Sequence, residues 1–415
     1  MLTRYVRIWK QVDSWAADAV HFRRAVLGIF LFALILRVVA AVVHPYYLPD
    51  SADYSALAKA IATGHRYEVH GQFARRMPGY PVFMAGFYAL FGFHHLPILL
   101  VQAMFSALTT SFCALFGRYV SPATGLLAGA LAAVDPLGIG FSASLLTEPL
   151  FTFVFVVSLY LFFKIMQRPN RWGLWVSFAA FWAVGVYIRA EVSLCLFPLL
   201  LWSVLVASRG SDRKNSALGG ILAVLLVGVC LLPWWIRNDR LFHQDFFRFT
   251  TLQGISLYES VYSGATGGPR QSDLIIPPSI QRLNESQRDL AWTHRAFTDI
   301  FQHPLRVLGL AFVKIARTWS PWLHARGYAS LWLNIVLTLW YTPLFILAII
   351  GLFRYPMWSP LFGVLLVPIV YFTLMHAVFL GSVRYRVPVM PLVVVFTAMG
   401  MAPAIRRKQD SARVA

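Results

Sequence analysis

The segment AVLGIFLFALILRVVAAVVHPYYLPDSADY, residues 25–54, passes within a few positions from an apolar run, interrupted by Arg37, to an acidic stretch. The apolar run from Ala25 to Val43 has about 19 residues, the length with which an α-helix crosses the hydrocarbon core of a bilayer. It has no small-residue cleavage site, and Tyr46 and Tyr47 follow it. We therefore predict a retained first membrane span rather than a cleaved signal peptide.

The same pattern continues along the chain. Of its 415 residues, 58% are hydrophobic and only 13% are charged, whereas roughly a quarter of a soluble domain is charged. The fold class predicted is an all-α, polytopic transmembrane protein of about 10–11 spans, with interfacial helices in its outer loops. The predicted spans are 24–43, 97–117, 123–141, 148–164, 173–189, 191–207, 217–236, 329–353, 359–380 and 387–403.

The short block 79–93, rich in Gly, Phe and Tyr, is either an eleventh span or an interfacial helix. Basic residues beside the spans favour the second interpretation, because cytoplasmic loops are enriched in Lys and Arg. If the N-terminus is cytoplasmic and 79–93 does not cross, five successive cytoplasmic turns carry cations. These are Arg118; Lys164, Arg168 and Arg171; Arg209, Arg213 and Lys214; Arg354; and Arg406 to Lys408.

This topology gives three parts: a membrane module with the first outer loop (1–236, loop 44–96), a large outer loop (237–328) and C-terminal spans (329–415). In the first loop a helix is expected from Ser51 to Thr63, capped by Asp50 or Ser51. In the second, apolar residues at helical spacing predict an amphipathic helix over 304–319 that lies on the membrane. The three cysteines, Cys113, Cys195 and Cys230, lie in apolar blocks and are expected to pack there.

Polar side chains from separate segments share the outer side on this topology. Each has an ordinary explanation as a helix cap, a lipid-facing arginine or an interfacial tyrosine. Those explanations do not account for carboxylates facing several arginines, and ionisable groups near membrane spans are functional candidates. The set is Asp50, Asp53, Tyr54, Arg75, Arg76, Tyr80, Glu148, Arg189, Glu191, Arg237, Arg384, Tyr385 and Arg386.

Such a set suits a reaction on an anionic lipid. Arginine binds phosphate in a bidentate manner, a carboxylate accepts a proton from an attacking hydroxyl, and fixed cations stabilise a departing phosphate. The net charge of +19 is explained by topology and by an anionic ligand, so no nucleic-acid partner is expected. No close-spaced metal motif is present among the histidines, so we expect no cofactor, with a divalent metal as the alternative.

At these positions the chain resembles the GT-C glycosyltransferases, in particular bacterial relatives of the dolichyl-phosphate-mannose protein mannosyltransferases and of the lipid A aminoarabinose transferase (glycosyltransferase family 39). The resemblance covers almost the whole chain in family order. Its five motifs are PDSADYSALAKAIATG at 49–64, RRMPGYPVFMAGFYALFG at 75–92, LLTEPLFTF at 145–153, PWWIRN at 233–238 and RYRVPVMP at 384–391.

The resemblance implies a bacterial inner-membrane enzyme with its active site on the periplasmic or extracellular side. It implies transfer from a polyprenyl-phosphate sugar to a glycan, lipid or protein hydroxyl, with inversion. The matching positions make Asp50 the base, Tyr54 its neighbour, Arg76 with Arg75 the donor-phosphate ligands and Glu148 the second acid. Further donor ligands are expected at Arg237, Arg384 and Arg386, and substrate contacts at Tyr54, Tyr80, Arg189, Glu191 and Tyr385.

Two departures from the family pattern leave alternatives. Many relatives have Asp-Glu where this chain has Asp50-Ser51, so Asp53 is an alternative base. No separate soluble C-terminal domain is expected, which leaves acceptor binding to the loop 237–328. The competing functions are a lipid-linked-glycan flippase or transporter, a polysaccharide polymerase or ligase, and a non-enzymatic assembly factor.

Overall fold

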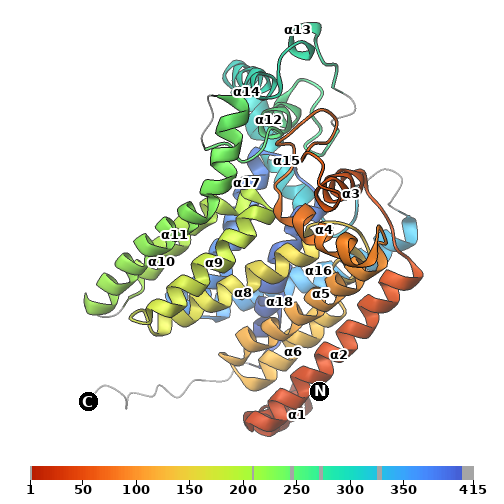
Figure 1. The fold of residues 1–415 in the computed structure, drawn as a ribbon. Coiled ribbons are helices and arrows are strands. Elements are labelled where there is room, and N and C mark those ends of the chain that lie inside the picture. The colour runs from red at the N-terminus through yellow and green to blue at the C-terminus, as the bar shows by residue number, and fades with distance from the viewer. Residues whose placement is uncertain (1, 208–209, 244–246, 271–273, 325–329, 404–415) are drawn as a thin grey trace.

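The computed structural model describes residues 2–207, 210–243, 247–270, 274–324 and 330–403. Within these ranges the regular elements are helices, and the one β-bridge joins Val69 to Gln72. The helices form a long bundle with a smaller group of helices at one end (Figure 1). The predicted cytoplasmic cations Arg209 and Arg406 to Lys408 lie outside the described residues.

The bundle confirms an all-α membrane protein. Among the described residues, seven helices have the length and apolarity to cross a bilayer, and a bent pair raises the number to eight. The seven are α2 (Ala19–Val43), α5 (Leu96–Arg118), α8 (Glu148–Gln167), α11 (Gly210–Phe242), α16 (Leu331–Arg354), α17 (Pro360–Val378) and the combined segment Val383–Met401, made of η3 (Val383–Val389) and α18 (Met390–Met401).

Shorter apolar segments complete the bundle. They are α9 (Trp172–Ile188) and the pair η1 (Ala190–Cys195) and α10 (Leu196–Leu205). Each of the ten predicted spans therefore coincides with a helix or a broken helix, although length alone supports seven or eight. The block 79–93 forms α4 (Gly79–Phe91), whose 13 residues reach about 20 Å and are too short to cross a core of about 30 Å.

The predicted span 123–141 is broken into α6 (Pro122–Ala133) and α7 (Pro136–Ser142), with a bend of 51°. Asp135 lies at the break and caps α7. The carbonyl oxygens of Ala132 and Ala133, freed where α6 ends, accept hydrogen bonds from the buried guanidinium of Arg37 at 3.0 and 2.8 Å. The break is stable inside the bundle because side chains of the bundle satisfy the exposed backbone groups.

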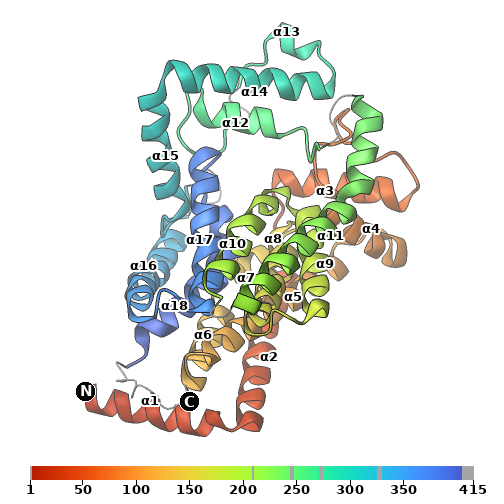
Figure 2. The ribbon, with the colours of Figure 1, turned by 90° about the vertical axis from the view of Figure 1, so that its left-hand side faces the viewer.

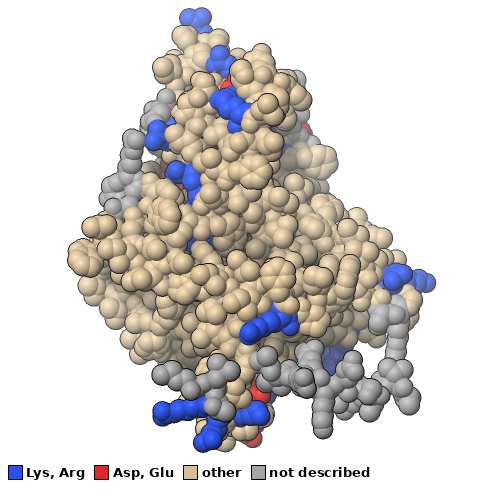
Figure 3. Space-filling view, turned by 180° about the vertical axis from the view of Figure 1, so that it is seen from behind, with Lys and Arg blue, Asp and Glu red and all other residues tan. Residues whose placement is uncertain are grey.

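Charged residues gather toward the two ends of the molecule. In the space-filling view few Lys, Arg, Asp or Glu side chains lie across the middle of the visible face, whereas cations lie above and below it (Figure 3). At the lower end α1 (Leu2–Ala17) lies across the bundle, nearly perpendicular to α2 (Figure 2). The Asp13 carboxylate fixes α1 there by accepting the Ala123 N–H at 2.9 Å. This distribution fits a bilayer around the middle of the bundle.

The opposite end is formed by the two long loops, whose helices we call the cap. Its members are α3 (Pro49–Ala62), α4, α12 (Gln253–Val261), α13 (Pro278–Gln281), α14 (Glu285–Gln302) and α15 (Pro304–Thr318). The long helix α11 continues from the bundle toward the cap (Figure 1). The amphipathic helix predicted over 304–319 is present as α15.

Helix α15 exposes its apolar side chains and buries a cation. Leu305 and Phe312 are 83% and 66% exposed, whereas Lys314 is fully buried. The Lys314 ammonium donates to the Val378 carbonyl oxygen at 2.8 Å, and burial lowers the pKa of Lys314 to about 8. The exposed apolar face is consistent with the predicted membrane contact, but Lys314 points into the protein.

The prediction that Asp50 or Ser51 caps the helix of the first loop was wrong. Helix α3 begins at Pro49, because its N-cap is Leu48 and the proline occupies the first helical position, where proline is favoured. The Ser51 hydroxyl accepts the Leu48 N–H at 3.2 Å. Asp50 therefore lies inside the first turn and its carboxylate is free to point away from the backbone.

Two glycines allow α16 and α18 to pack closely. A Cβ atom placed on Gly351 would lie 1.9 Å from the Phe396 carbonyl oxygen, and one on Gly400 would lie 1.9 Å from the Leu347 carbonyl oxygen. Small residues permit this backbone approach in membrane helices. This contact fixes the C-terminal end of α18. The 3-10 turn η3, which directly precedes α18, carries residues of the candidate site.

We predict that Gly351→Ala lowers the free energy of unfolding by about 1–3 kcal/mol, because the added methyl group forces the two backbones apart. Thermal unfolding in detergent measures this loss. Gly228→Ala in α11 is the matched control, since nothing lies within 4 Å of a Cβ there. Equal melting temperatures for both variants would contradict the close packing.

Candidate functional site

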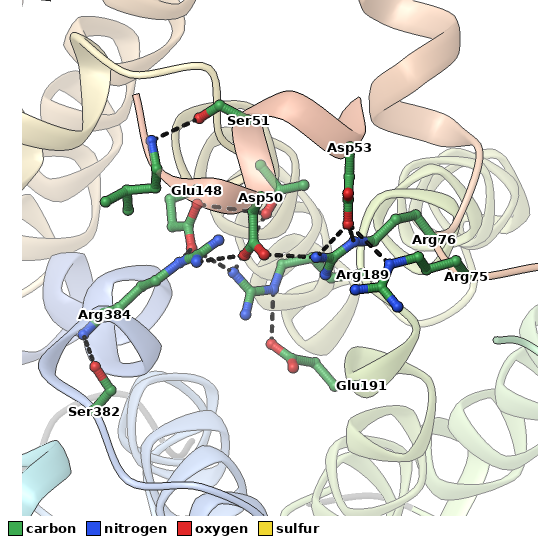
Figure 4. A network of polar contacts seen from close by, with 12 residues as sticks. Asp50, Ser51, Asp53, Arg75, Arg76, Glu148, Arg189, Glu191, Ser382 and Arg384 are labelled. Carbon is green, nitrogen blue, oxygen red and sulfur yellow. Dashed lines mark hydrogen bonds and ion pairs between the residues drawn. The ribbon is translucent and has the colours of Figure 1, made fainter. Parts of the chain in front are cut away.

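Four carboxylates and four arginines form one connected network where the bundle meets the cap (Figure 4). They come from α3, the segment after it, the start of α8, the α9–η1 junction and η3. The members are Asp50, Asp53, Glu148 and Glu191 with Arg75, Arg76, Arg189 and Arg384. Eight of the thirteen predicted site residues thus meet in one place.

Asp50 is held between two arginines. Its Oδ1 accepts from Arg76 Nη2 at 2.6 Å, and its Oδ2 accepts from Arg384 Nη1 at 2.6 Å. The Asp50 side chain is 28% exposed, more than the other carboxylates of the network. It is the acid that both arginines share and that a ligand in the site reaches most easily.

Asp53 lies one helical turn further along α3 and is more enclosed, with a side chain only 7% exposed. Its Oδ2 accepts from Arg75 Nε at 3.0 Å and from Arg76 Nη2 at 2.9 Å. Its Oδ1 lies 3.0 Å from His70 Nε2. Asp53 therefore orients both arginines of the segment 75–76.

The other half of the network centres on Glu148, the first residue of α8, whose side chain is fully buried. Its Oε1 accepts from Arg189 Nη1 at 3.0 Å and also from Arg384 Nε. Arg189 Nε in turn donates to Glu191 Oε1 at 2.8 Å. Arg384 thus bridges Asp50 and Glu148 and joins the two halves.

The charges of the network set the protonation of its cap residues. Burial raises the pKa of Asp50, but the guanidinium groups of Arg76 and Arg384 outweigh burial and hold that pKa well below its usual range. Burial also raises the pKa of Asp53, but the guanidinium groups of Arg76 and Arg75 outweigh burial and lower that pKa overall. Burial raises the pKa of the Tyr54 hydroxyl. Both aspartates are ionised at neutral pH.

Aromatic rings surround the network. The Arg76 guanidinium lies 5.3 Å from the Tyr54 ring centroid, and Tyr54 packs edge-on against Tyr80. Tyr80 donates to the side-chain oxygen of Gln102, a buried residue that the sequence did not single out. Tyr385 stacks on His376 with ring centroids 4.4 Å apart. The predicted tyrosines therefore line the site, and Gln102 and His376 fix two of them.

Two predicted arginines do not join the network. Arg237 Nη2 donates to the Phe73 carbonyl oxygen at 2.9 Å, and its guanidinium lies 4.6 Å from the Trp234 ring centroid. Arg386 is buried and donates to the Thr318 carbonyl oxygen at 3.0 Å. Both guanidinium groups are occupied by backbone oxygens of the cap. Their positions follow from long-range contacts that no local sequence pattern displays.

Among the described residues, no three His, Cys, Asp or Glu side chains are grouped to hold a metal ion. Each carboxylate of the network is instead directed at an arginine. An arginine-rich site of this kind is suited to an anion, which it binds through several charge-assisted hydrogen bonds.

Residues 75–236 match the family model of the dolichyl-phosphate-mannose-protein mannosyltransferases. The archaeal oligosaccharyltransferase AglB from Archaeoglobus fulgidus, solved with an inhibitory peptide and a dolichol-phosphate, superposes with a TM-score of 0.55 and 14% identity. That similarity covers 90% of this chain and 50% of AglB, and the apo form gives the same values. The chain therefore spans about half the length of these solved structures.

ArnT from Cupriavidus metallidurans, solved with undecaprenyl phosphate, aligns over 91% of this chain and 77% of that one at 14% identity. Its TM-score is 0.44. No curated protein matches the sequence significantly. The family match covers residues 75–236, and the similarity to AglB is one of fold. Both agree with the resemblance of the five motifs to the GT-C glycosyltransferases.

The depressed pKa of Asp50 predicts a pH dependence of stability. A carboxyl group whose pKa is lower in the folded protein stabilises the fold above its unfolded pKa, about 3.9 for aspartate, and loses this effect as pH falls through the folded value. We expect Asp50→Asn to melt below the unmodified protein by a constant interval from about pH 5 to 8, which narrows only below about pH 4.

Thermal unfolding of both proteins across this pH range measures the interval. A difference that already disappears between pH 7 and pH 5 would mean that the Asp50 pKa is raised rather than lowered, and would contradict the ion pairs of Asp50.

Proposed function

We propose that this chain is an integral membrane glycosyltransferase that moves a sugar from a polyprenyl-phosphate donor to a hydroxyl acceptor. The observation that carries the proposal is the pair of arginines on Asp50, which approach it from different segments at 2.6 Å each. Two converging guanidinium groups suit a phosphate, and an acid between them suits the proton transfer that the reaction requires.

The donor phosphate binds to Arg76 and Arg384, with Arg75 beside them. All three side chains are 18–21% exposed, so they are accessible from the site while most of each is enclosed. Their cations stabilise the negative charge that develops on the departing phosphate. AglB, which shares the fold, was solved in complex with a dolichol-phosphate, and that complex supports a lipid phosphate as the ligand.

Asp50 is the base. It takes the proton of the acceptor hydroxyl, whose oxygen attacks the anomeric carbon from the side opposite the phosphate. The bond from that carbon to the phosphate oxygen breaks, its electron pair stays on the phosphate, and the sugar configuration is inverted. Asp53 is the less suitable base, because its side chain is 7% exposed against 28% for Asp50 and also contacts His70.

Donor binding also prepares the base. In the ligand-free site Arg76 and Arg384 keep the pKa of Asp50 low, so its carboxylate is a weak proton acceptor. A phosphate that takes over these guanidinium groups weakens their attraction for Asp50, and the basicity of Asp50 rises. The base therefore becomes effective when the donor is in place.

The remaining network residues hold the site in shape. Glu148, Arg189 and Glu191 form a chain of ion pairs behind Arg384 and fix its guanidinium. Tyr54 and Tyr385 provide walls against which a sugar packs, and the fully buried Tyr80 supports the Tyr54 ring. The acceptor is a glycan, lipid or protein hydroxyl that approaches beneath the loop 237–328.

The site belongs on the periplasmic or extracellular face of a bacterial inner membrane, with the N-terminus in the cytoplasm. This orientation rests on the positive-inside distribution of cations in the sequence. The reaction needs no metal in this proposal, because the arginines supply the charge. A flippase or transporter is less well supported, since transporters bind their substrates near the bilayer midplane. The network instead lies where the bundle meets the cap.

We predict that Asp50→Asn, expressed at normal levels, loses at least about 100-fold in transfer rate, in keeping with removal of a general base. The assay supplies a radiolabelled polyprenyl-phosphate sugar to the purified protein and measures released lipid phosphate and labelled acceptor. Glu68→Gln is the matched control, because Glu68 is an acid of the same loop outside the network.

Undiminished transfer by Asp50→Asn would exclude Asp50 as the base. Movement of intact donor between leaflets without release of lipid phosphate would instead favour a flippase.

A further inference from the structure

We infer that Glu285, in the second outer loop, is a positioning residue that fixes the donor-binding arginines Arg75 and Arg76 through the backbone just before them. This inference rests on the proposed function of those arginines. It assigns to the loop 237–328 a part in donor binding in addition to the acceptor role expected for it.

Every backbone N–H and carbonyl group of Phe73 and Ala74 makes a hydrogen bond. The two N–H groups donate to the Glu285 carboxylate, Phe73 N to Oε2 at 2.6 Å and Ala74 N to Oε1 at 3.0 Å. The Phe73 carbonyl oxygen accepts from Arg237 at 2.9 Å, and the Ala74 carbonyl oxygen accepts from the Thr251 N–H at 2.9 Å. All of these partners lie outside the first loop.

The Glu285 carboxylate is itself fixed. Glu285 is the first residue of α14, which begins with a capping box between Asn284 and Gln287. An acidic side chain in this first turn is favoured by the helix dipole. The Thr251 hydroxyl also donates to Glu285 Oε1. Glu285 thus presents a rigid two-oxygen acceptor to the segment, and a helix of 18 residues stands behind it.

The hydrogen bonds of Glu285 to Phe73 and Ala74 position Arg75 and Arg76, because these arginines are the next two residues in the chain. Arg76 binds Asp50 and Asp53 with its side chain, and its carbonyl oxygen accepts from the Tyr67 hydroxyl at 3.0 Å. The segment 73–76 has no regular helix or strand of its own, so its backbone geometry depends on these outside contacts. Without the Glu285 carboxylate, two N–H groups at a part-buried site lose their acceptors, which is costly.

Arg237 acquires a role here as well. Although it does not touch the ion-pair network, it holds the Phe73 carbonyl oxygen while Glu285 holds the Phe73 N–H. The backbone that precedes Arg75 and Arg76 is therefore held by a residue of α11 and by a residue of α14. A displacement of the second loop loosens Arg75 and Arg76 without changing any residue that touches the donor.

The test compares the full-length protein with Glu285→Gln and with Asp299→Asn, an acid of the same helix whose side chain has no partner among the described residues. Two measurements are made: amide hydrogen exchange of residues 73–76, and binding of farnesyl phosphate as a short-chain polyprenyl phosphate. Glutamine keeps the size of the side chain but offers only one acceptor oxygen.

We expect Glu285→Gln to raise exchange at Phe73 and Ala74 and to weaken farnesyl phosphate binding about tenfold, the effect of losing roughly one charge-assisted hydrogen bond. In the transfer assay, KM for the donor rises while KM for the acceptor stays near that of the unmodified protein. Glu285→Asp restores part of the binding, and Asp299→Asn changes none of these values.

Increased exchange with unchanged phosphate binding would overturn the positioning role and leave only a structural contact. Unchanged exchange in a folded Glu285→Gln protein would show that Glu285 does not hold the segment. If the unmodified protein itself fails to bind farnesyl phosphate, both the proposed function and the donor-positioning role fail. The exchange data still decide whether Glu285 holds the backbone of Phe73 and Ala74.

Discussion

The site depends on an uninterrupted alternation of opposite charges. A charge taken out of water is costly unless a partner of opposite sign and good geometry replaces the lost hydration. Here every member is satisfied by its neighbours in the sequence of contacts Arg75, Asp53, Arg76, Asp50, Arg384, Glu148, Arg189, Glu191. Because the chain of pairs draws on distant segments, it is complete only when α3, the segment 75–76, α8, the α9–η1 junction and η3 have come together.

Breaks in the helices supply the network with its side chains. Glu148 begins α8, Arg189 ends α9 where η1 starts, and Arg384 lies in the 3-10 turn η3 that precedes α18. At such positions the side chains leave the bundle near its end instead of facing lipid. The cap lies over them, and Glu285 of its second loop holds the backbone of Phe73 and Ala74, just before the arginines of the first loop. Bundle and cap form one site.

The sequence predicted the core of the network because sorting the charges by side of the membrane is a strong constraint. Asp50, Arg76, Glu148 and Arg384 were each assigned to one face, and they meet there. Arg237 was assigned to the same face, yet it binds a carbonyl oxygen, since sidedness does not reveal which partner a cation takes. Glu285 was not found, because its contacts are to backbone groups 212 and 211 positions away and leave no trace in a motif.

The balance of four carboxylates against four guanidinium groups in the described network has a consequence for selectivity. An anion that enters must compete with the network carboxylates for the arginines. Because these carboxylates are attached to the protein beside the arginines, their effective concentration there is high. Inorganic phosphate or chloride in solution has a lower effective concentration than these carboxylates and therefore displaces them poorly. A phosphate carried on a membrane lipid is itself confined to a thin layer next to the site, so it competes on similar terms. We therefore infer that the balanced charges disfavour soluble anions relative to a membrane-bound one.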